Sequence, residues 1–172
     1  DRISARKRIE DAAAVEYEER ISAKDDTLTE LEISQDHSLS DTQQDLLQRK
    51  LRKQRKAQIE IQQTISSLED PGKNWNPYDS KERTRVDSAY QAFLDGEHPS
   101  SPAGQVAAAE IAVRTGFLPK TSFHAIRAAT TSDDPVSLAS NLEMLSQTLQ
   151  RQPGAIDPYD GKGGVLSKLS DY

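Results

Sequence analysis

Apolar residues recur at helical spacing near the start of the chain. Five of them follow one another at intervals of four: Ala5, Ile9, Ala13, Tyr17 and Ile21. This spacing predicts an amphipathic helix over about residues 2–23. A break at residues 25–27 is expected before a short apolar segment at 28–33, which a polar loop at 35–38 follows.

The next predicted helix is the longest. Ser40 is followed three residues later by Gln43, which is the arrangement of a capping box, and no Gly or Pro interrupts the chain up to residue 70. Apolar residues of this helix alternate steps of four and three, and we call them the heptad row: Leu47, Leu51, Ile61, Ile65 and Leu68. Gln54 and Gln58 fill the two intervening positions, where an isolated coiled coil would carry aliphatic residues. We therefore expect the row to bind a neighbouring helix, either from the same chain folded back as a hairpin or from another chain.

Every Gly and Pro of the chain lies after residue 70, and these residues divide the second half into short segments. Starts of helices are predicted at Asp79, Ser101-Pro102, Pro119 and Asp134-Pro135, with helix ends at Gly96 and Gly116. The residues expected to face a core are Val86, Ala89, Tyr90, Phe93 and Leu94; then Val106, Ala109, Ile111 and Val113; then Phe123, Ile126 and Ala129; and finally Leu138, Leu142, Leu145 and Leu149.

These patterns predict an all-α fold with three parts. Residues 1–70 should form a long charged helical hairpin or coiled-coil-like arm, residues 71–155 a small bundle of about four short helices, and residues 156–172 an irregular tail. Because the chain starts at Asp1 and not at a methionine, we expect it to be part of a larger protein.

Composition limits what these helices can bury. Hydrophobic residues make up 34% of the chain, aromatic residues 5% and charged residues 29%, so only a small core is expected. The chain has no cysteine, which excludes disulfides and thiolate metal sites. Its apolar runs are also too short to span a membrane.

Sequence motifs for catalysis or cofactor binding are missing. His37, His98 and His124 lie far apart and without further ligands at metal-binding spacing. The run 161–164 contains Lys and three Gly, but it lacks the spacing of a phosphate-binding Walker loop. We therefore expect no catalytic residue, cofactor, metal or small-molecule substrate in this segment.

The most concentrated chemical signal is a run of cations on the long helix. Six positive residues fall within eight positions: Arg49, Lys50, Arg52, Lys53, Arg55 and Lys56. They could keep a long helix soluble and pair with acids of a neighbouring helix. Alternatively, they could contact nucleic-acid phosphates without reading sequence. No aromatic residue interrupts the run, so stacking on single-stranded bases is not indicated.

One group of residues resembles a known family. Trp75-Asn76-Pro77-Tyr78-Asp79, with Arg83, Val86-Asp87 and Tyr90 after it, is similar to an "Asn-Pro-x-Asp … Val-Asp … aromatic" pattern of large internal virion proteins of tailed bacteriophages. The stretches 115–119 and 132–135, each followed by a predicted helix, resemble the helix–turn–helix rhythm of the same family. Leu39-Ser40-Asp41, leading into a charged helix, resembles its helical arms. The resemblance covers about residues 28–155.

The resemblance implies a function. Such proteins are packaged inside the capsid, often beside or fused to a peptidoglycan-cleaving lytic transglycosylase, and are ejected to help DNA cross the host envelope. No transglycosylase motif occurs here, so we expect a non-catalytic structural segment that packs with other virion proteins, including copies of itself. The alternatives are a helical arm that contacts DNA non-specifically and a part of a longer transglycosylase polypeptide.

Overall fold

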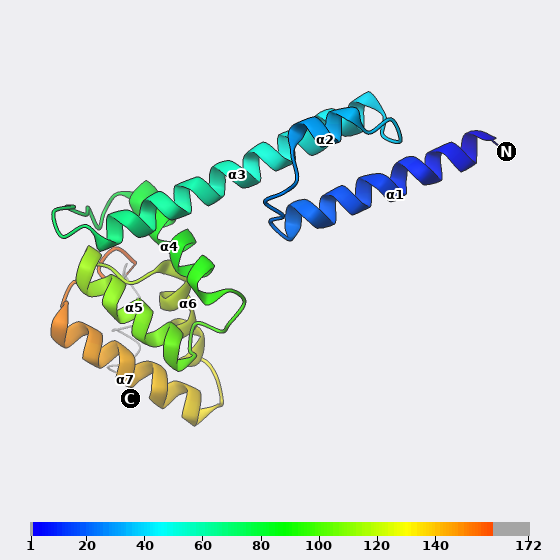
Figure 1. Cartoon of the computed structure of the whole chain (residues 1–172). Coiled ribbons are helices and arrows are strands. Elements are labelled where there is room, and N and C mark those ends of the chain that lie inside the picture. Colours follow the sequence, from blue (N-terminus) through cyan, green and yellow to red (C-terminus); the bar gives the residue numbers. More distant parts are fainter. Residues whose placement is uncertain (1, 160–172) are drawn as a thin grey trace. The chain divides into compact units, whose positions relative to one another are not determined.

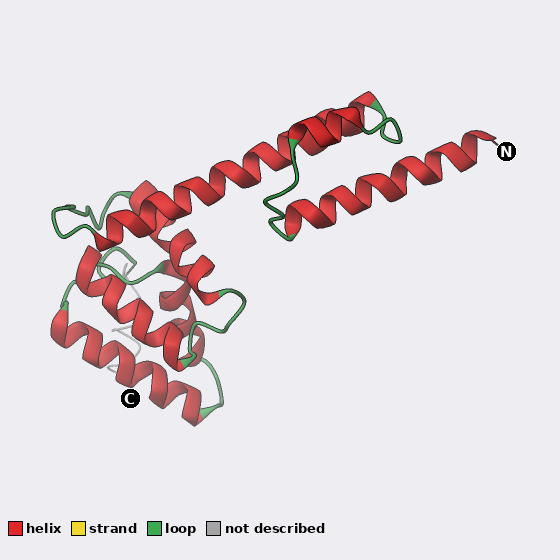
Figure 2. Ribbon diagram, viewed as in Figure 1, coloured by secondary structure: helices red, strands yellow, loops and turns green. Residues whose placement is uncertain are grey.

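A computed structural model describes residues 2–159, and within them the backbone forms seven helices and no strand (Figure 2). The helices, coloured along the chain in Figure 1, are α1 (Arg2–Ser22), α2 (Glu30–Gln35), α3 (Asp41–Glu69), α4 (Ser80–Leu94), α5 (Pro102–Thr115), α6 (Lys120–Ala129) and α7 (Pro135–Arg151). The predicted all-α class is therefore confirmed. The chain divides into two compact units, residues 1–59 and 60–172, and the division falls inside α3, before the boundary predicted at residue 70.

The N-terminal unit contains α1, α2 and the first part of α3. The segment around α2 runs back along α3, as two hydrogen bonds show. Near the start of α3, the side chain of Gln44 donates to the carbonyl of Asp36 (2.9 Å). Further along α3, Arg55 donates to the carbonyl of Leu28 (2.6 Å), which comes earlier in the chain than Asp36. This returning segment and α3 form the antiparallel hairpin. Helices α1 and α3 themselves run in the same direction (Figure 1).

This arrangement differs from the hairpin of two long helices that the spacing suggested. Eighteen residues, 23–40, separate the two long helices, and they include α2. Leu28 and Ile33 in this connection are fully buried, so it forms a third arm of the unit and not an exposed loop. The sequence marks this segment as apolar but gives no sign of its direction.

The core of the N-terminal unit is thin. Its buried residues are Tyr17, Ile21, Leu28, Ile33, Leu39, Leu47 and Leu51. The hydroxyl of Tyr17 donates to Asp36 at 3.1 Å, and burial together with this bond raises the pKa of Tyr17 to about 12. Arg20 pairs with Asp25 at 2.7 Å and with Glu32, so α1 is tied to the returning segment at several points.

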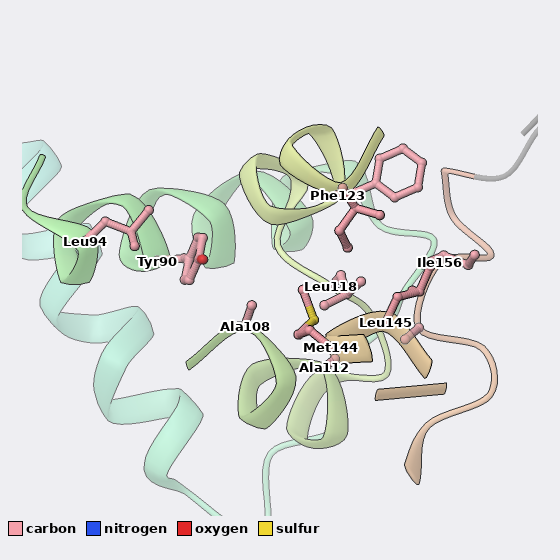
Figure 3. Packing of buried hydrophobic residues seen from close by; sticks show 11 residues of the cluster. Tyr90, Leu94, Ala108, Ala112, Leu118, Phe123, Met144, Leu145 and Ile156 are labelled. Atoms are coloured by element: carbon pink, nitrogen blue, oxygen red, sulfur yellow. The ribbon is translucent and has the colours of Figure 1, made fainter. Parts of the chain in front are cut away.

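The C-terminal unit is a bundle of α4, α5, α6 and α7 around one core. Figure 3 shows Leu118, Met144 and Leu145 within this cluster, together with Tyr90, Ala108 and Ala112. Ala155 and Ile156 are fully buried in the same cluster, and Tyr159 packs against it. The bundle therefore includes at least residues 156–159, which the sequence assigned to the irregular tail.

The helix boundaries of this bundle follow the predicted capping signals. Asp79, Ser101 and Asp134 each accept a backbone N–H of the first turn that they precede. Gly116 ends α5 with a φ of 87°, a left-handed conformation that favours glycine. Ser40 and Gln43 also interact as predicted, since the Gln43 side chain accepts the Ser40 backbone N–H at 3.2 Å.

The inward face of α5 was predicted incorrectly. Val106 is 64% exposed and Val113 is 38% exposed, whereas Gly104, Ala108 and Ala112 are buried. Small residues on this face let neighbouring elements approach closely: a Cβ on Gly104 would lie 2.8 Å from the carbonyl oxygen of Pro99. Phe93 of α4, also expected inside, is 58% exposed.

A buried carboxylate links α4 to α6. Asp87 accepts the backbone N–H of Thr121 at 2.7 Å and its hydroxyl at 3.0 Å, and also the amide of Gln91 at 2.8 Å. The first turn of α6 has no side-chain cap of its own, because Pro119 stands at its N-cap. Asp87 therefore satisfies one backbone N–H, that of Thr121, in the first turn of another helix across the bundle.

We predict that Asp87→Ala lowers the free energy of unfolding of the C-terminal unit by about 1–3 kcal/mol, because Thr121 loses its acceptor in a partly buried place. Urea unfolding followed by the fluorescence of Trp75, the chain's only tryptophan, measures this change. Ser88→Ala, at the adjacent exposed position, is the control and should change stability little. Equal stability of both variants would contradict the assigned role of Asp87.

Candidate interaction surfaces

The heptad row is divided between the two units. Leu47 and Leu51 are 1% and 2% exposed and belong to the core of the N-terminal unit. Ile61, Ile65 and Leu68 are partly buried in the C-terminal unit. The first two residues therefore pack within their own chain, against α1 and the returning segment and not against an antiparallel long helix.

Arg114 holds the end of α3 in the C-terminal unit. Its guanidinium donates to the carbonyl of Leu68 at 2.9 Å and to that of Asp70. These carbonyls belong to the last turn of α3 and the residue after it, where no helical partner follows. Arg114 thus fixes the C-terminal end of α3, the part of the helix that carries Ile61, Ile65 and Leu68.

Four of the six cations on α3 have partners within the N-terminal unit. Lys50 pairs with Glu18 of α1, and Arg52 pairs with Glu30 of α2 at 2.7 Å. Arg55 donates to the backbone carbonyls of Asp26 (3.2 Å) and Leu28 (2.6 Å). Arg49 has only a long contact of 3.7 Å with Asp45 on the same helix, and both side chains are about three-quarters exposed.

The other two cations, Lys53 and Lys56, share one outward face of α3 with Arg49. Lys53 and Lys56 are exposed and make no ion pair within residues 2–159. Arg49, Lys53 and Lys56 are spaced by four and three residues, which places them on one side of α3. Of the predicted phosphate-contact residues, these three are the ones that the fold leaves available.

The residues that carry the family resemblance form the start and the anchor of α4. Asn76 and Asp79 shape the turn and cap the helix, and the guanidinium of Arg83 donates to the carbonyl of Pro77 at 2.7 Å. Val86 is fully buried, and the hydroxyl of Tyr90 donates to the carbonyl of Gly104 at 2.9 Å. Each of these residues therefore has a structural task in the bundle.

A polar hollow of about 240 Å³ lies beside Trp75 and is lined by residues of α3, α4 and the link between them. Lys73 lies 3.0 Å from Glu82 and 5.0 Å from the centre of the Trp75 ring, and Glu82 also accepts the backbone N–H of Asn76 at 2.6 Å. The most enclosed acid of the hollow is thus already bound by two donors of the link. Arg85, at the rim, is exposed and makes no ion pair in the part of the chain that the structure describes.

An apolar groove of about 460 Å³ lies between the parallel helices α1 and α3. Its lining comprises Glu18, Ile21 and Ser22 from α1, and Lys50, Lys53, Gln54 and Ala57 from α3. The side-chain nitrogen of Gln54 is buried there without a hydrogen-bond partner among residues 2–159, which costs stability.

The histidines take no part in a joint site. His37, His98 and His124 are all exposed, and Nδ1 of His98 accepts the backbone N–H of Ser100 at 3.1 Å. Among residues 2–159, no group of three His, Cys, Asp or Glu side chains is placed to hold a metal ion. Within the same residues, no helix has the length and hydropathy needed to cross a bilayer. The glycine run 161–164 lies outside the described residues.

Comparison with known proteins gives no match: no family model fits the chain, and no curated protein or solved structure is significantly similar to it.

The contact of Arg55 with two carbonyls leads to a stability prediction. Arg55→Gln should lower the free energy of unfolding of the N-terminal unit by about 1 kcal/mol, because the returning segment loses a charged donor to its backbone. Lys56→Gln, one residue further and without an ion pair within residues 2–159, should change the free energy of unfolding by no more than about 0.5 kcal/mol. Thermal unfolding followed by circular dichroism compares the two variants. Equal melting curves would show that Arg55 does not fix the returning segment.

Proposed function

We propose that this chain is a non-catalytic structural segment of an internal, DNA-ejection protein of a tailed-phage virion, and that it acts by helix packing in an oligomeric assembly. The resemblance over residues 28–155 suggests the class of protein. The thin core of the N-terminal unit suggests the mode of action. A peptidoglycan-cleaving domain in a longer parent polypeptide is compatible with this role.

The observation that carries the proposal is the amount of apolar surface left on the helices of the N-terminal unit. Ile9 and Val15 of α1 are 59% and 52% exposed, and Leu46 of α3 is 50% exposed. Single exposed apolar residues are ordinary on a protein surface. Here Val15 and Leu46 border an apolar groove between two long charged helices, which is the kind of surface that a further helix covers.

The demands of ejection also fit this composition. A protein that passes through a phage tail has to unfold or thread, and small helical units without disulfides unfold at low cost. The chain has no cysteine, and its N-terminal unit has a core of seven residues. These features support the proposal without being specific to phage proteins.

The proposal predicts where the protein is found. Mass spectrometry of purified virions should detect peptides of this chain in DNA-filled particles. The peptides should be lost from empty particles collected after ejection, while those of the major capsid protein, the control, remain. Absence of the chain from filled particles would overturn the proposal, and its retention in empty ones would make it a fixed structural component.

Contact with nucleic acid is the second candidate, and the outward row of Arg49, Lys53 and Lys56 is the observation that favours it. Three cations on one side of a helix can follow a phosphate backbone. The net charge of the chain is −6, so binding would depend on this row and not on the overall charge of the protein.

We predict that replacing all three of these residues by Gln removes binding to duplex DNA at low salt. In the original chain, log K should fall with log salt, with a slope of about −0.9 for each phosphate contacted. Lys50→Gln with Arg52→Gln is the matched control, because those cations are already paired within the unit. Fluorescence anisotropy measures both. Loss of binding in the control alone, or no binding by the original chain, would exclude this row as a DNA contact.

A further inference from the structure

The apolar surface between α1 and α3 extends beyond the residues that line the groove. Glu18 of α1 is paired with Lys50 of α3, which sets the register of the two parallel helices. Val15 precedes Glu18 by three residues and Leu46 precedes Lys50 by four, so each lies on the groove side of its helix. Val15 and Leu46, both half exposed, therefore extend the apolar lining one turn toward the start of the two helices.

Along this groove, two apolar regions are separated by a positively charged residue. Val15 and Leu46 form an apolar layer at one end, and Ile21 and Ala57 line the groove at the other. Between them α3 presents Lys53, which has no acidic partner within residues 2–159. A helix that fits here needs an apolar residue followed by acids at helical spacing.

The outward face of α1 has this pattern. Ile9, Glu16 and Glu19 are all exposed and lie on one side of α1, because they are spaced by seven and three residues. Leu46, Lys53 and Lys56 of α3 are spaced by the same seven and three residues. Neither Glu16 nor Glu19 makes an ion pair in the described part of the chain.

We propose that the groove between α1 and α3 binds α1 of a second copy of this chain, in parallel, with Ile9 against Leu46 and with Glu16 and Glu19 facing Lys53 and Lys56. This inference rests on the proposed function, because it names the partner that the helix packing requires. The surfaces used by the two copies differ, so the contact is heterologous and can continue from copy to copy.

Charge reversal in the full chain tests the pairing. The variant Lys53→Glu with Lys56→Glu carries a negative groove and a negative α1, and the variant Glu16→Lys with Glu19→Lys carries a positive groove and a positive α1. Each alone should associate at least about tenfold more weakly than the original chain, as two repulsive contacts replace two attractive ones. A mixture of the two should associate again, because each groove then meets an α1 of opposite charge.

Sedimentation velocity over a wide range of concentration measures the association, and circular dichroism checks that each variant keeps its helicity. Leu46→Ser should weaken association, whereas Ile59→Ser, which replaces an equally exposed residue on another side of α3, should not. A chain that stays monomeric at every concentration overturns the inference, as does a mixture of variants that fails to associate. A monomeric chain that is nevertheless found in virions would leave the proposed function standing with a different partner.

Discussion

A single uninterrupted helix, α3, supplies apolar residues to both compact units, and the packing of each unit depends on its own part of this helix. Leu47 and Leu51 complete the core of the N-terminal unit, and Ile61, Ile65 and Leu68 are partly buried in the C-terminal unit. Between them stand Gln54 and Gln58, two partly buried polar residues that add no apolar side chain to either core. The heptad row is therefore two short packing surfaces on one helix, and its polar middle marks the place where the chain divides.

The charged residues of the N-terminal unit position its helices more than they stabilise them. Pairs between exposed side chains, such as Arg52 with Glu30, contribute little free energy. They do specify a register, because Lys50 meets Glu18 on α1 and Arg52 meets Glu30 on the returning segment. Arg55 contributes in another way, since it satisfies backbone carbonyls at the turn before α2. The charge run thus binds α1 and the returning segment through Lys50, Arg52 and Arg55, and it leaves Arg49, Lys53 and Lys56 exposed.

Much of the fold could be predicted from the sequence because its helix boundaries depend on local chemistry. Asp79, Ser101 and Gly116 act within one turn of their own positions, and each was found in its predicted role. The packing of the helices against one another was harder to predict. The spacing on α5 favoured Val106 over Gly104, because apolar size is the usual sign of a buried face, whereas close approach of the backbone required the smallest residues. The direction of the returning segment likewise depends on contacts with α3 that no local pattern encodes.

The candidate surfaces were only partly visible in the sequence for the same reason. Six adjacent cations were evident, but their division into paired and free residues depends on Glu18 and Glu30, which lie far away in the chain. The groove could not be predicted, since it exists only because α1 and α3 run in parallel. Most stability of a helix comes from packing of its apolar face, and the side chains of residues 3–9 in α1 are all exposed. The first turns of α1 thus gain little burial from their own chain, which is the physical reason to look for a second chain at this end of the molecule.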